Sequence, residues 1–384
     1  MRPPIEYDPR YEVPEADEGD TQAELLDVLH AIADTTFKDT GQPLRSVHAK
    51  SHGLLRAELR VLPDLPSVLA QGLLATPASY PVVMRLSTTP GDVLEDSVST
   101  PRGVALKVIG AQGPRLPGSE DDATQDFVLV NGTTFLNAGP KAFLGGLKML
   151  AATTDKAPAL KKMLSAALRQ VERAIEKAGT DSAALKGMGG QPATHPLGDS
   201  YYSQVPILFG PYMAKVALVP TAVGLTTLKD APVDYSADPD VLRKVVSDHF
   251  AVQGGEWDLR VQFCTNIEEM PIEDASSEWS EELSPYVTVA RLIAPPQIGW
   301  SEALSAAIDE CMSFSPWHGL AAHRPLGAVN RVRKAAYEMS SKLRARRRGA
   351  PIVEPVSLDG LPFDQAGTGH AAAALLDTEP VAPR

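Results

Sequence analysis

Apolar residues recur at two spacings along this chain, and each spacing predicts a different kind of element. In residues 21–36 an apolar side chain appears at every third or fourth position, which is typical of an amphipathic helix. In residues 45–62 apolar and polar positions alternate, most clearly from Leu55 to Val61, which is typical of one or two half-buried strands. A helix followed by extended structure is therefore expected near the start of the chain.

The same two patterns continue along the chain and are separated by turns rich in Gly, Pro and Asp. Further strands are expected at residues 81–87, 103–109, 126–130, 203–208, 212–219, 257–265 and 287–293. Further helices are expected at residues 63–75, 140–151, 157–177, 239–249 and 328–348. Many strands of antiparallel type with helices between them predict an α+β fold built on a closed or nearly closed β-barrel.

These elements divide the chain into three parts, of which one is a folded domain. Residues 1–20 are acidic and contain several prolines, which predicts an extended N-terminal arm. Residues 21–348 predict one large domain with a substantial core. Residues 349–384 are rich in Pro, Gly and Ala, which predicts a tail that is mostly disordered.

Composition excludes several classes of function. The net charge of −12 argues against a nucleic-acid partner, because recognition of nucleic acid needs a basic surface. Cys264 and Cys311 provide neither a disulfide framework nor a metal-binding spacing, so we expect two buried thiols in a reducing compartment. No apolar run reaches membrane-spanning length and the first residues lack the apolar core of a signal peptide, so we expect a cytoplasmic protein.

One tyrosine in the last predicted helix has arginines on its own helical face. Arg333 lies four positions before Tyr337 and Arg344 lies seven positions after it, so the three side chains share one stripe. An arginine one turn away can donate a hydrogen bond to the phenol oxygen and favour its ionised form. A phenolate is a good ligand for ferric iron. The alternative is an ordinary basic helix that contains a tyrosine.

Four upstream segments carry a further pattern. They read Arg45-Ser-Val-His-Ala-Lys-Ser-His-Gly53, Arg85-Leu-Ser-Thr88, Pro101-Arg-Gly-Val-Ala-Leu-Lys-Val108 and Asp126-Phe-Val-Leu-Val-Asn-Gly-Thr-Thr-Phe135. In this order, and followed by the arginine–tyrosine helix, they resemble motifs of the haem catalases. The family motifs read Arg-Val-Val-His-Ala-Lys-Gly, Arg-Phe-Ser-Thr, Pro-Arg-Gly-Phe-Ala-Val-Lys-Phe and Asp-Leu-Val-Gly-Asn-Asn-Thr-Pro. The resemblance extends over residues 45–344.

This resemblance implies an eight-stranded antiparallel β-barrel, with haem b held between the barrel wall and the tyrosine helix. Tyr337 would be the axial ligand of the ferric iron, and Arg333 would donate to its phenol oxygen. On the opposite face of the haem, His48 would be the acid–base group and Ser87 would orient its ring. Asn131 would donate its amide to the peroxide, although its match to the family asparagine requires a shift of one residue. Taken alone, the histidine could equally be an ordinary core or surface residue.

The remaining matches concern the edge and the face of the haem. Arg45, Arg85 and Arg344 match family positions that contact the two propionates, and a guanidinium fork suits a carboxylate. Phe143 matches a phenylalanine that lies against the macrocycle, although an ordinary core residue on a helix face would give the same pattern. Val47 matches the valine of catalases. Alternation along a strand would point Val47 to the opposite side of the strand from His48.

The resemblance implies an enzyme that cleaves the O–O bond of hydrogen peroxide or of organic hydroperoxides through a ferryl intermediate. Thr100 stands in place of a channel aspartate and Thr89 in place of a channel valine. We also expect the helical domain of large catalases to be absent. These departures favour the small catalase-related peroxidases, which use an outside electron donor. The donor stays unidentified, and a homo-oligomer is compatible with the sequence.

Two alternative functions stay open. Allene oxide synthases, which rearrange fatty-acid hydroperoxides, carry Thr immediately before the distal histidine, where this chain has Val47. A haem-binding sensor or carrier without turnover would need neither His48 nor Asn131, so the presence of both favours an enzyme.

Overall fold

The computed structural model describes residues 2–89, 91, 93–153 and 190–364 of the chain. The helices are α1 (Glu18–Thr40), α2 (Pro140–Thr153), α5 (Val223–Thr226), α6 (Val241–Val252), α7 (Glu302–Leu304) and α8 (Gly327–Arg348). The strands are β1 (Ser51–Val61), β2 (Ser79–Thr88), β3 (Arg102–Ile109), β4 (Thr124–Val130), β5 (Tyr201–Tyr202), β6 (Ile207–Phe209), β7 (Tyr212–Pro220), β8 (Gly255–Phe263) and β9 (Val287–Ala294). A π-helical turn (Ser305–Glu310) continues directly from α7.

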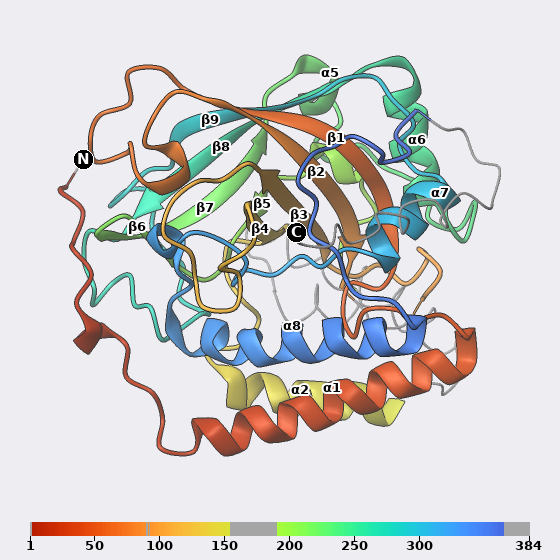
Figure 1. Cartoon of the computed structure of the whole chain (residues 1–384), viewed down its shortest axis with the longest axis horizontal. Helices are drawn as coiled ribbons and strands as arrows, with labels where there is room; N and C mark the ends of the chain where they lie inside the picture. Colours follow the sequence, from red (N-terminus) through yellow and green to blue (C-terminus); the bar gives the residue numbers. More distant parts are fainter. Residues whose placement is uncertain (1, 90, 92, 154–189, 365–384) are drawn as a thin grey trace, which may run out of the picture.

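The strands form one antiparallel sheet in the order β5-β4-β3-β2-β1-β9-β8-β7-β6. A further pairing of β5 with β7, in which Tyr201 lies opposite Leu218, closes eight strands into a ring. Strand β6 lies outside this ring as the hairpin partner of β7. The α+β class and the eight-stranded antiparallel barrel that the sequence predicts are therefore confirmed (Figure 1).

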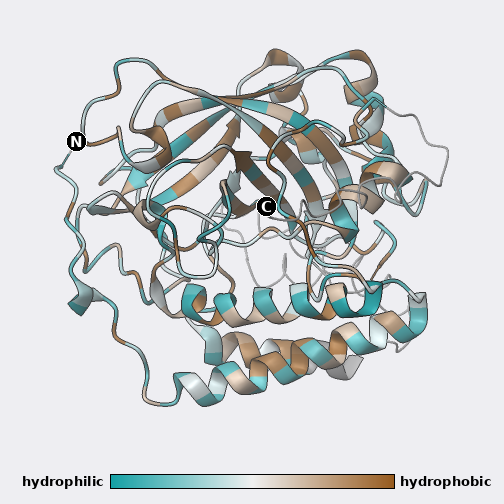
Figure 2. Cartoon of the chain, in the orientation of Figure 1, coloured by the Kyte–Doolittle hydropathy of each residue, from teal (hydrophilic) through white to brown (hydrophobic). Residues whose placement is uncertain are grey.

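Alternation along the strands separates the inside of the barrel from its outer face. On β1, Leu55, Ala57, Leu59 and Val61 belong to the central core, as the sequence pattern predicts. Leu54 points the other way and packs in a second cluster with residues of α7 and the π-helical turn. Figure 2 shows apolar and polar positions alternating along the strand ribbons. The barrel wall is therefore packed on both faces, and its outer face carries helices.

Helix α8 lies between the barrel and a layer formed by α1 and α2 (Figure 1). An apolar cluster joins the three helices and includes Leu25, Leu29 and Ile32 of α1, Leu144 and Leu147 of α2, and Val332 of α8. The α1 positions are those of the helical stripe that the sequence predicts. Because this cluster holds the outer side of α8, the opposite side of the helix is fixed against the barrel.

Two elements near the start of the chain differ from the prediction. Strand β1 begins at Ser51, so residues 45–50 form a bend and not the first part of a strand. Residues 63–75 contain only the 3₁₀ turn Gly72–Leu74 in place of the predicted helix. Gly72 has a φ of 53°, in the left-handed region, which interrupts a right-handed helix.

The predicted strand at residues 203–208 is also wrong in its bounds, because residues 203–206 lie between β5 and β6 and only 207–208 belong to a strand. Gln204 between them has a φ of 61°, and Pro206 has no N–H to donate to a ladder. The helix predicted at residues 157–177 lies outside the described residues. Within the described part of the chain, no helix combines the length and the apolar character needed to cross a bilayer.

The two ends of the described chain pack against the domain. At the N-terminus, the N–H of Ile5 donates to the carbonyl of Cys264 (2.9 Å), and Glu12 forms ion pairs with Arg324 and Arg331 (2.9 and 3.2 Å). Helix α1 then begins at Glu18.

At the other end, residues 350–364 belong to the tail that composition predicts to be mostly disordered, and part of this segment packs against the domain. Glu354 pairs with the buried Lys107 on β3, and Phe363 is buried in the outer cluster of the barrel wall. One carboxylate and one aromatic ring make these contacts. The overall composition of the tail cannot predict contacts of individual side chains. Residues 365–384 lie outside the described residues.

Candidate active site

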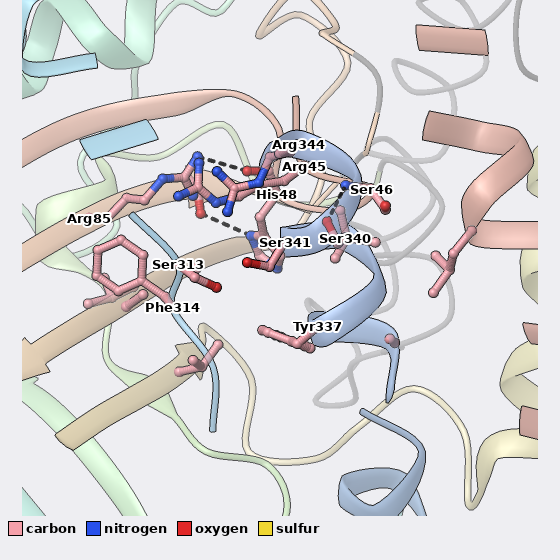
Figure 3. A pocket seen from close by; sticks show the side chains of 18 of the residues that line it. Arg45, Ser46, His48, Arg85, Ser313, Phe314, Tyr337, Ser340, Ser341 and Arg344 are labelled. Carbon is pink, nitrogen blue, oxygen red and sulfur yellow. Dashed lines mark hydrogen bonds between the residues drawn. The ribbon is translucent and has the colours of Figure 1, made fainter. Parts of the chain in front are cut away.

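A cavity lies between α8 and the wall formed by β2, β3 and β4. About 680 Å³ of space lies within it, a figure that includes its open mouth. Most of the predicted site residues line it, namely Arg45, Val47, His48, Arg85, Ser87, Tyr337 and Arg344. The barrel wall and the bend before β1 supply five of these side chains and α8 supplies two (Figure 3).

His48 belongs to the bend before β1 and has left-handed backbone geometry, with a φ of 53°. Its N–H donates to the carbonyl of Thr89 (2.9 Å), and its ring Nδ1 lies 3.0 Å from Oγ of Ser87. Burial lowers the pKa of His48 to about 3, and the nearby charges of Arg85 and Arg333 act in the same direction. The ring is therefore neutral near pH 7. When Nδ1–H donates to the serine, Nε2 is free to accept a proton.

Val47 and His48 both line the cavity, so the alternation that the sequence predicts at this point is wrong. The reason is the bend that replaces the start of the strand. Gly91 packs closely against this bend, and a Cβ atom on that glycine would lie 2.0 Å from the carbonyl oxygen of Ser46. With the bend held there, the left-handed histidine projects to the same cavity as the residue before it.

Tyr337 reaches the cavity from α8, with Arg333 one turn before it. The guanidinium Nη2 of Arg333 donates to the phenol oxygen (3.0 Å), and its Nη1 donates to Oδ1 of Asn330 (3.2 Å). Helix α8 begins at Gly327, where φ is 82° and a Cβ would lie 2.1 Å from the carbonyl oxygen of Ile272. Glycine at this position therefore lets the helix start close enough to the barrel to aim the tyrosine at the cavity.

Arg45, Arg85 and Arg344 come together at one end of the cavity, as Figure 3 shows, and we call these three residues the arginine cluster. They gather around Asp309 of the π-helical turn. Oδ1 of Asp309 accepts from Nε of Arg85 (2.6 Å) and lies 3.3 Å from Nη1 of Arg45. Its backbone carbonyl accepts from Arg45 (2.6 Å) and Arg344 (2.9 Å).

The arginine cluster carries more positive charge than its surroundings balance. Burial, followed by repulsion from Arg344 and Arg85, lowers the pKa of Arg45 well below its ordinary value. Burial and the charge of Arg85 lower the pKa of Arg344 to about 10. Nε of Arg344 is buried and has no hydrogen-bond partner among the described residues. A ligand that carries carboxylates would balance the excess positive charge and would supply an acceptor for the unpaired Nε of Arg344.

The structure does not bring Asn131 to the cavity. Its Oδ1 accepts from the backbone N–H of Arg102 (2.8 Å), and its Nδ2 donates to Oδ2 of Asp199 (3.0 Å). Asp199 also pairs with the guanidinium group of Arg102 (2.7 Å). The amide is therefore engaged by the backbone of Arg102 and by Asp199, and it does not line the cavity.

Phe143, Arg333 and Thr100 also lie outside the cavity lining. Phe143 packs in the cluster between α1, α2 and α8, and its ring centroid lies 5.2 Å from that of Phe135. This placement is that of a core residue on a helix face. Thr100 is buried, and its hydroxyl has no hydrogen-bond partner among the described residues.

Sequence reasoning missed several residues of the site. Leu29 of α1, Phe314 and Ser340 line the cavity, and Oγ of Ser340 accepts from the backbone N–H of Ser46 (3.3 Å). Asp309 is the most important omission, because it holds the arginine cluster. Asp309 belongs to no recognisable sequence motif. Its role becomes apparent only from the arginines that surround it in space.

Comparison with solved structures places this arrangement in a known fold. A fungal catalase is 16% identical with a TM-score of 0.54, over 90% of this chain and 72% of that chain. Catalase A from Saccharomyces cerevisiae is 16% identical with a TM-score of 0.55, over 82% of this chain and 63% of that chain. A bacterial catalase is 16% identical with a TM-score of 0.54, over 90% of this chain and 66% of that chain.

The chain therefore has the catalase fold, which confirms the fold that its motifs imply. No protein-family model matches the sequence, and no curated protein matches it either. At this level of identity the activity has to be argued from the residues of the cavity.

Proposed function

We propose that the chain binds haem in this cavity and cleaves the O–O bond of peroxides. The observation that carries the proposal is that His48 and Tyr337 line one cavity from opposite elements, the bend before β1 and helix α8. The donor set fits haem: a phenol oxygen that accepts from Arg333 is suited to ferric iron, and the arginine cluster is suited to two propionates.

Each residue of the cavity then has a chemical task. When bound, haem would supply a ferric iron centre that can donate the two electrons needed to reduce the O–O bond of a peroxide. His48 is neutral near pH 7 because burial lowers its pKa to about 3. It would accept a peroxide proton at Nε2 and return that proton to the departing oxygen. Ser87 holds the ring in the tautomer that leaves Nε2 free.

Asn131 can take part in the reaction only if its side chain moves. Its amide would have to leave Asp199 before it could donate to a peroxide. Proton transfer by His48 does not require this movement, so we assign the cleavage step to the histidine. Asn131 is proposed to help only in a rearranged state of the cavity.

We further propose that organic hydroperoxides, reduced with an outside electron donor, are better substrates than hydrogen peroxide. Thr100 stands where a carboxylate would direct small polar molecules along its field, and a neutral hydroxyl does this poorly. The cavity is lined in part by apolar side chains, among them Leu29, Val104 and Leu129, which suits an organic substituent.

The test is a comparison of two reactions on purified protein reconstituted with haem. Oxygen evolution is measured with hydrogen peroxide, and oxidation of a dye donor is measured with an organic hydroperoxide. We expect donor oxidation to exceed oxygen evolution, and both to fall in His48→Gln. Rapid oxygen evolution without a donor would favour a plain catalase. Hydroperoxide loss with neither product would favour a rearranging enzyme, and no turnover at all would favour a sensor or carrier.

A further inference from the structure

Asp309 is a buried carboxylate whose two oxygens have different partners. Oδ1 faces Arg85 and Arg45, at 2.6 and 3.3 Å. Oδ2 accepts from the hydroxyls of Ser51 (2.6 Å) and Ser305 (3.0 Å). The side chain is 8% exposed, so its charge is compensated by these groups and not by water. Although burial raises the pKa of Asp309, the two arginines hold it below the ordinary value. The group is therefore ionised in the folded protein.

The arginines are also held in place by backbone carbonyls, which do not depend on this carboxylate. The carbonyl of Met312 accepts from Arg45 (2.9 Å) and from Arg344 (3.0 Å), and the carbonyl of His48 accepts from Arg85 (2.8 Å). The carbonyl of Asp309, in the last turn of the π-helical segment, also accepts from Arg45 and Arg344. The carboxylate of Asp309 therefore contributes charge to the arginine cluster, while the carbonyls contribute much of its orientation.

The charges of this part of the cavity do not balance. Arg45, Arg85 and Arg344 supply three positive charges. In the described part of the chain the carboxylate of Asp309 contacts Arg45 and Arg85, whereas Arg344 donates to the backbone carbonyl of Asp309. Three minus one leaves a surplus of two. Buried guanidinium groups cannot relieve this surplus by losing a proton, because arginine stays charged in proteins. Two additional anionic groups would neutralise it.

We propose that Asp309 is the specificity-determining residue that sets the charge of the arginine cluster to match a ligand with two carboxylates. This proposal rests on the proposed function, and it assigns a role in cofactor selection to a residue that touches no ligand itself. Before the ligand arrives, Asp309 limits the repulsion among the three arginines. After it arrives, the ligand carboxylates supply the remaining two negative charges.

The inference is tested with a pair of isosteric variants. Asp309→Asn removes the charge and keeps the shape, so the surplus rises from two to three. Glu310→Gln is the control, because it makes the same chemical change at the next position of the same turn, outside the ion pairs of the cluster. The probes are haem and its dimethyl ester, which has the same ring and iron but no free carboxylates. The measurements are the melting temperature without ligand and the dissociation constants by absorbance titration.

Asp309→Asn should melt at a lower temperature than the wild type and Glu310→Gln when no ligand is present, since three buried cations then lack their counter-ion. Its preference for haem over the ester should increase by at least about tenfold, because the propionates gain one more uncompensated positive charge. Equal changes in the two dissociation constants would indicate a purely structural role and would overturn the proposal. An unchanged melting temperature would overturn it as well.

A second variant covers the case in which Asp309→Asn does not fold. Combining it with Arg344→Gln restores the surplus of two, so the double variant should fold and melt closer to the wild type. Failure of the double variant would contradict the charge argument. If the wild type binds neither haem nor the ester, the proposed function fails, while the melting temperatures of the variants without ligand still test the charge role of Asp309.

Discussion

The ring of His48 lies directly against the backbone of Gly103 on β3. A Cβ atom on Gly103 would be 2.6 Å from Cε1 of His48 and 2.9 Å from Nδ1, which is closer than real Cβ atoms approach. The same ring nitrogen lies 3.0 Å from Oγ of Ser87. The glycine in the motif Pro-Arg-Gly therefore provides the space in which the histidine ring is held by the serine.

Gly103→Ala should displace the His48 ring and separate it from Ser87. We expect peroxide cleavage to slow by at least about tenfold, because a displaced acid–base group transfers protons poorly. Haem binding should fall less than the cleavage rate, since Gly103 lines the cavity but has no side chain that could hold the iron or the propionates. Stopped-flow rates and absorbance titration measure the two effects. Gly145→Ala on α2 is the control, because a Cβ there meets no atom within 4 Å.

Tyr337→Phe should abolish stable haem binding or give a visibly different ferric spectrum, because the ring stays but the phenol oxygen is lost. Arg333→Ala should have a smaller effect, since it removes one donor to that oxygen and leaves the ligand itself. Absorbance spectra after gel filtration measure both. Tyr80→Phe is a matched control, because that phenol donates to the carbonyl of Leu73 (3.3 Å), away from the cavity. A Tyr337→Phe protein with an unchanged spectrum would refute the assignment.

His48→Gln should retain haem while the rate of peroxide cleavage falls by at least about 10²-fold, the low end for general acid–base catalysis. Ser87→Ala should slow the reaction less, because it releases the ring but leaves its nitrogen. Stopped-flow mixing with peroxide gives the rates. His30→Gln is the control, because His30 is exposed on α1 near Asp34. An unaltered rate in His48→Gln would remove this histidine from the mechanism.

The peroxide cleavage rate should be independent of pH between about 5 and 8. The pKa of His48 is lowered to about 3, so the ring is neutral and able to accept a proton over this whole range. Stopped-flow rates at several pH values provide the measurement. A fall in rate with a midpoint near the ordinary histidine value of about 6.5 would show that the ring is not in the environment described here.

His318 should stabilise the protein most at mildly acidic pH. Although burial lowers its pKa, contact with Asp126 raises it above the ordinary 6.5, and Glu354 acts in the same direction. This stabilisation is fully present below the unfolded pKa and is lost as pH rises through the folded value. The melting temperature of His318→Gln should therefore differ more from the wild type at pH 6 than at pH 9. His30→Gln again serves as control, and a constant difference would contradict the argument.

The fold could be predicted largely from the sequence because its strands have one apolar face. Strands at residues 81–87, 103–109 and 287–293 correspond to β2, β3 and β9 with small changes at their ends. The errors fall where local geometry overrides periodicity. Gly72 and Gln204 adopt left-handed backbone conformations, which the pattern of apolar and polar residues does not predict.

Part of the site could be predicted for a different reason, namely that its residues are grouped in short motifs. Arg45, His48, Ser87 and Tyr337 line the cavity as their motifs imply. Asn131 does not, because the chain offers one asparagine where the family motif has two, and Asp199 binds its amide.

Asp309 could not be predicted at all, because its partners are distant in the chain. Arg45 and Arg85 lie 264 and 224 positions before it. Contacts over such separations depend on the closed barrel, so no window of sequence around the aspartate contains them.

The cavity joins segments that are far apart in the chain, and this has a consequence for synthesis. His48 leaves the ribosome before the strands of the barrel, whereas Tyr337 follows 289 positions later, after these strands. The wall that carries the histidine can close while the helix that carries the tyrosine is still being translated. A nascent chain that stopped before Gly327 would hold a complete barrel and half of a site. Only a chain that has been translated past α8 can therefore bind a ligand between the two walls of the cavity.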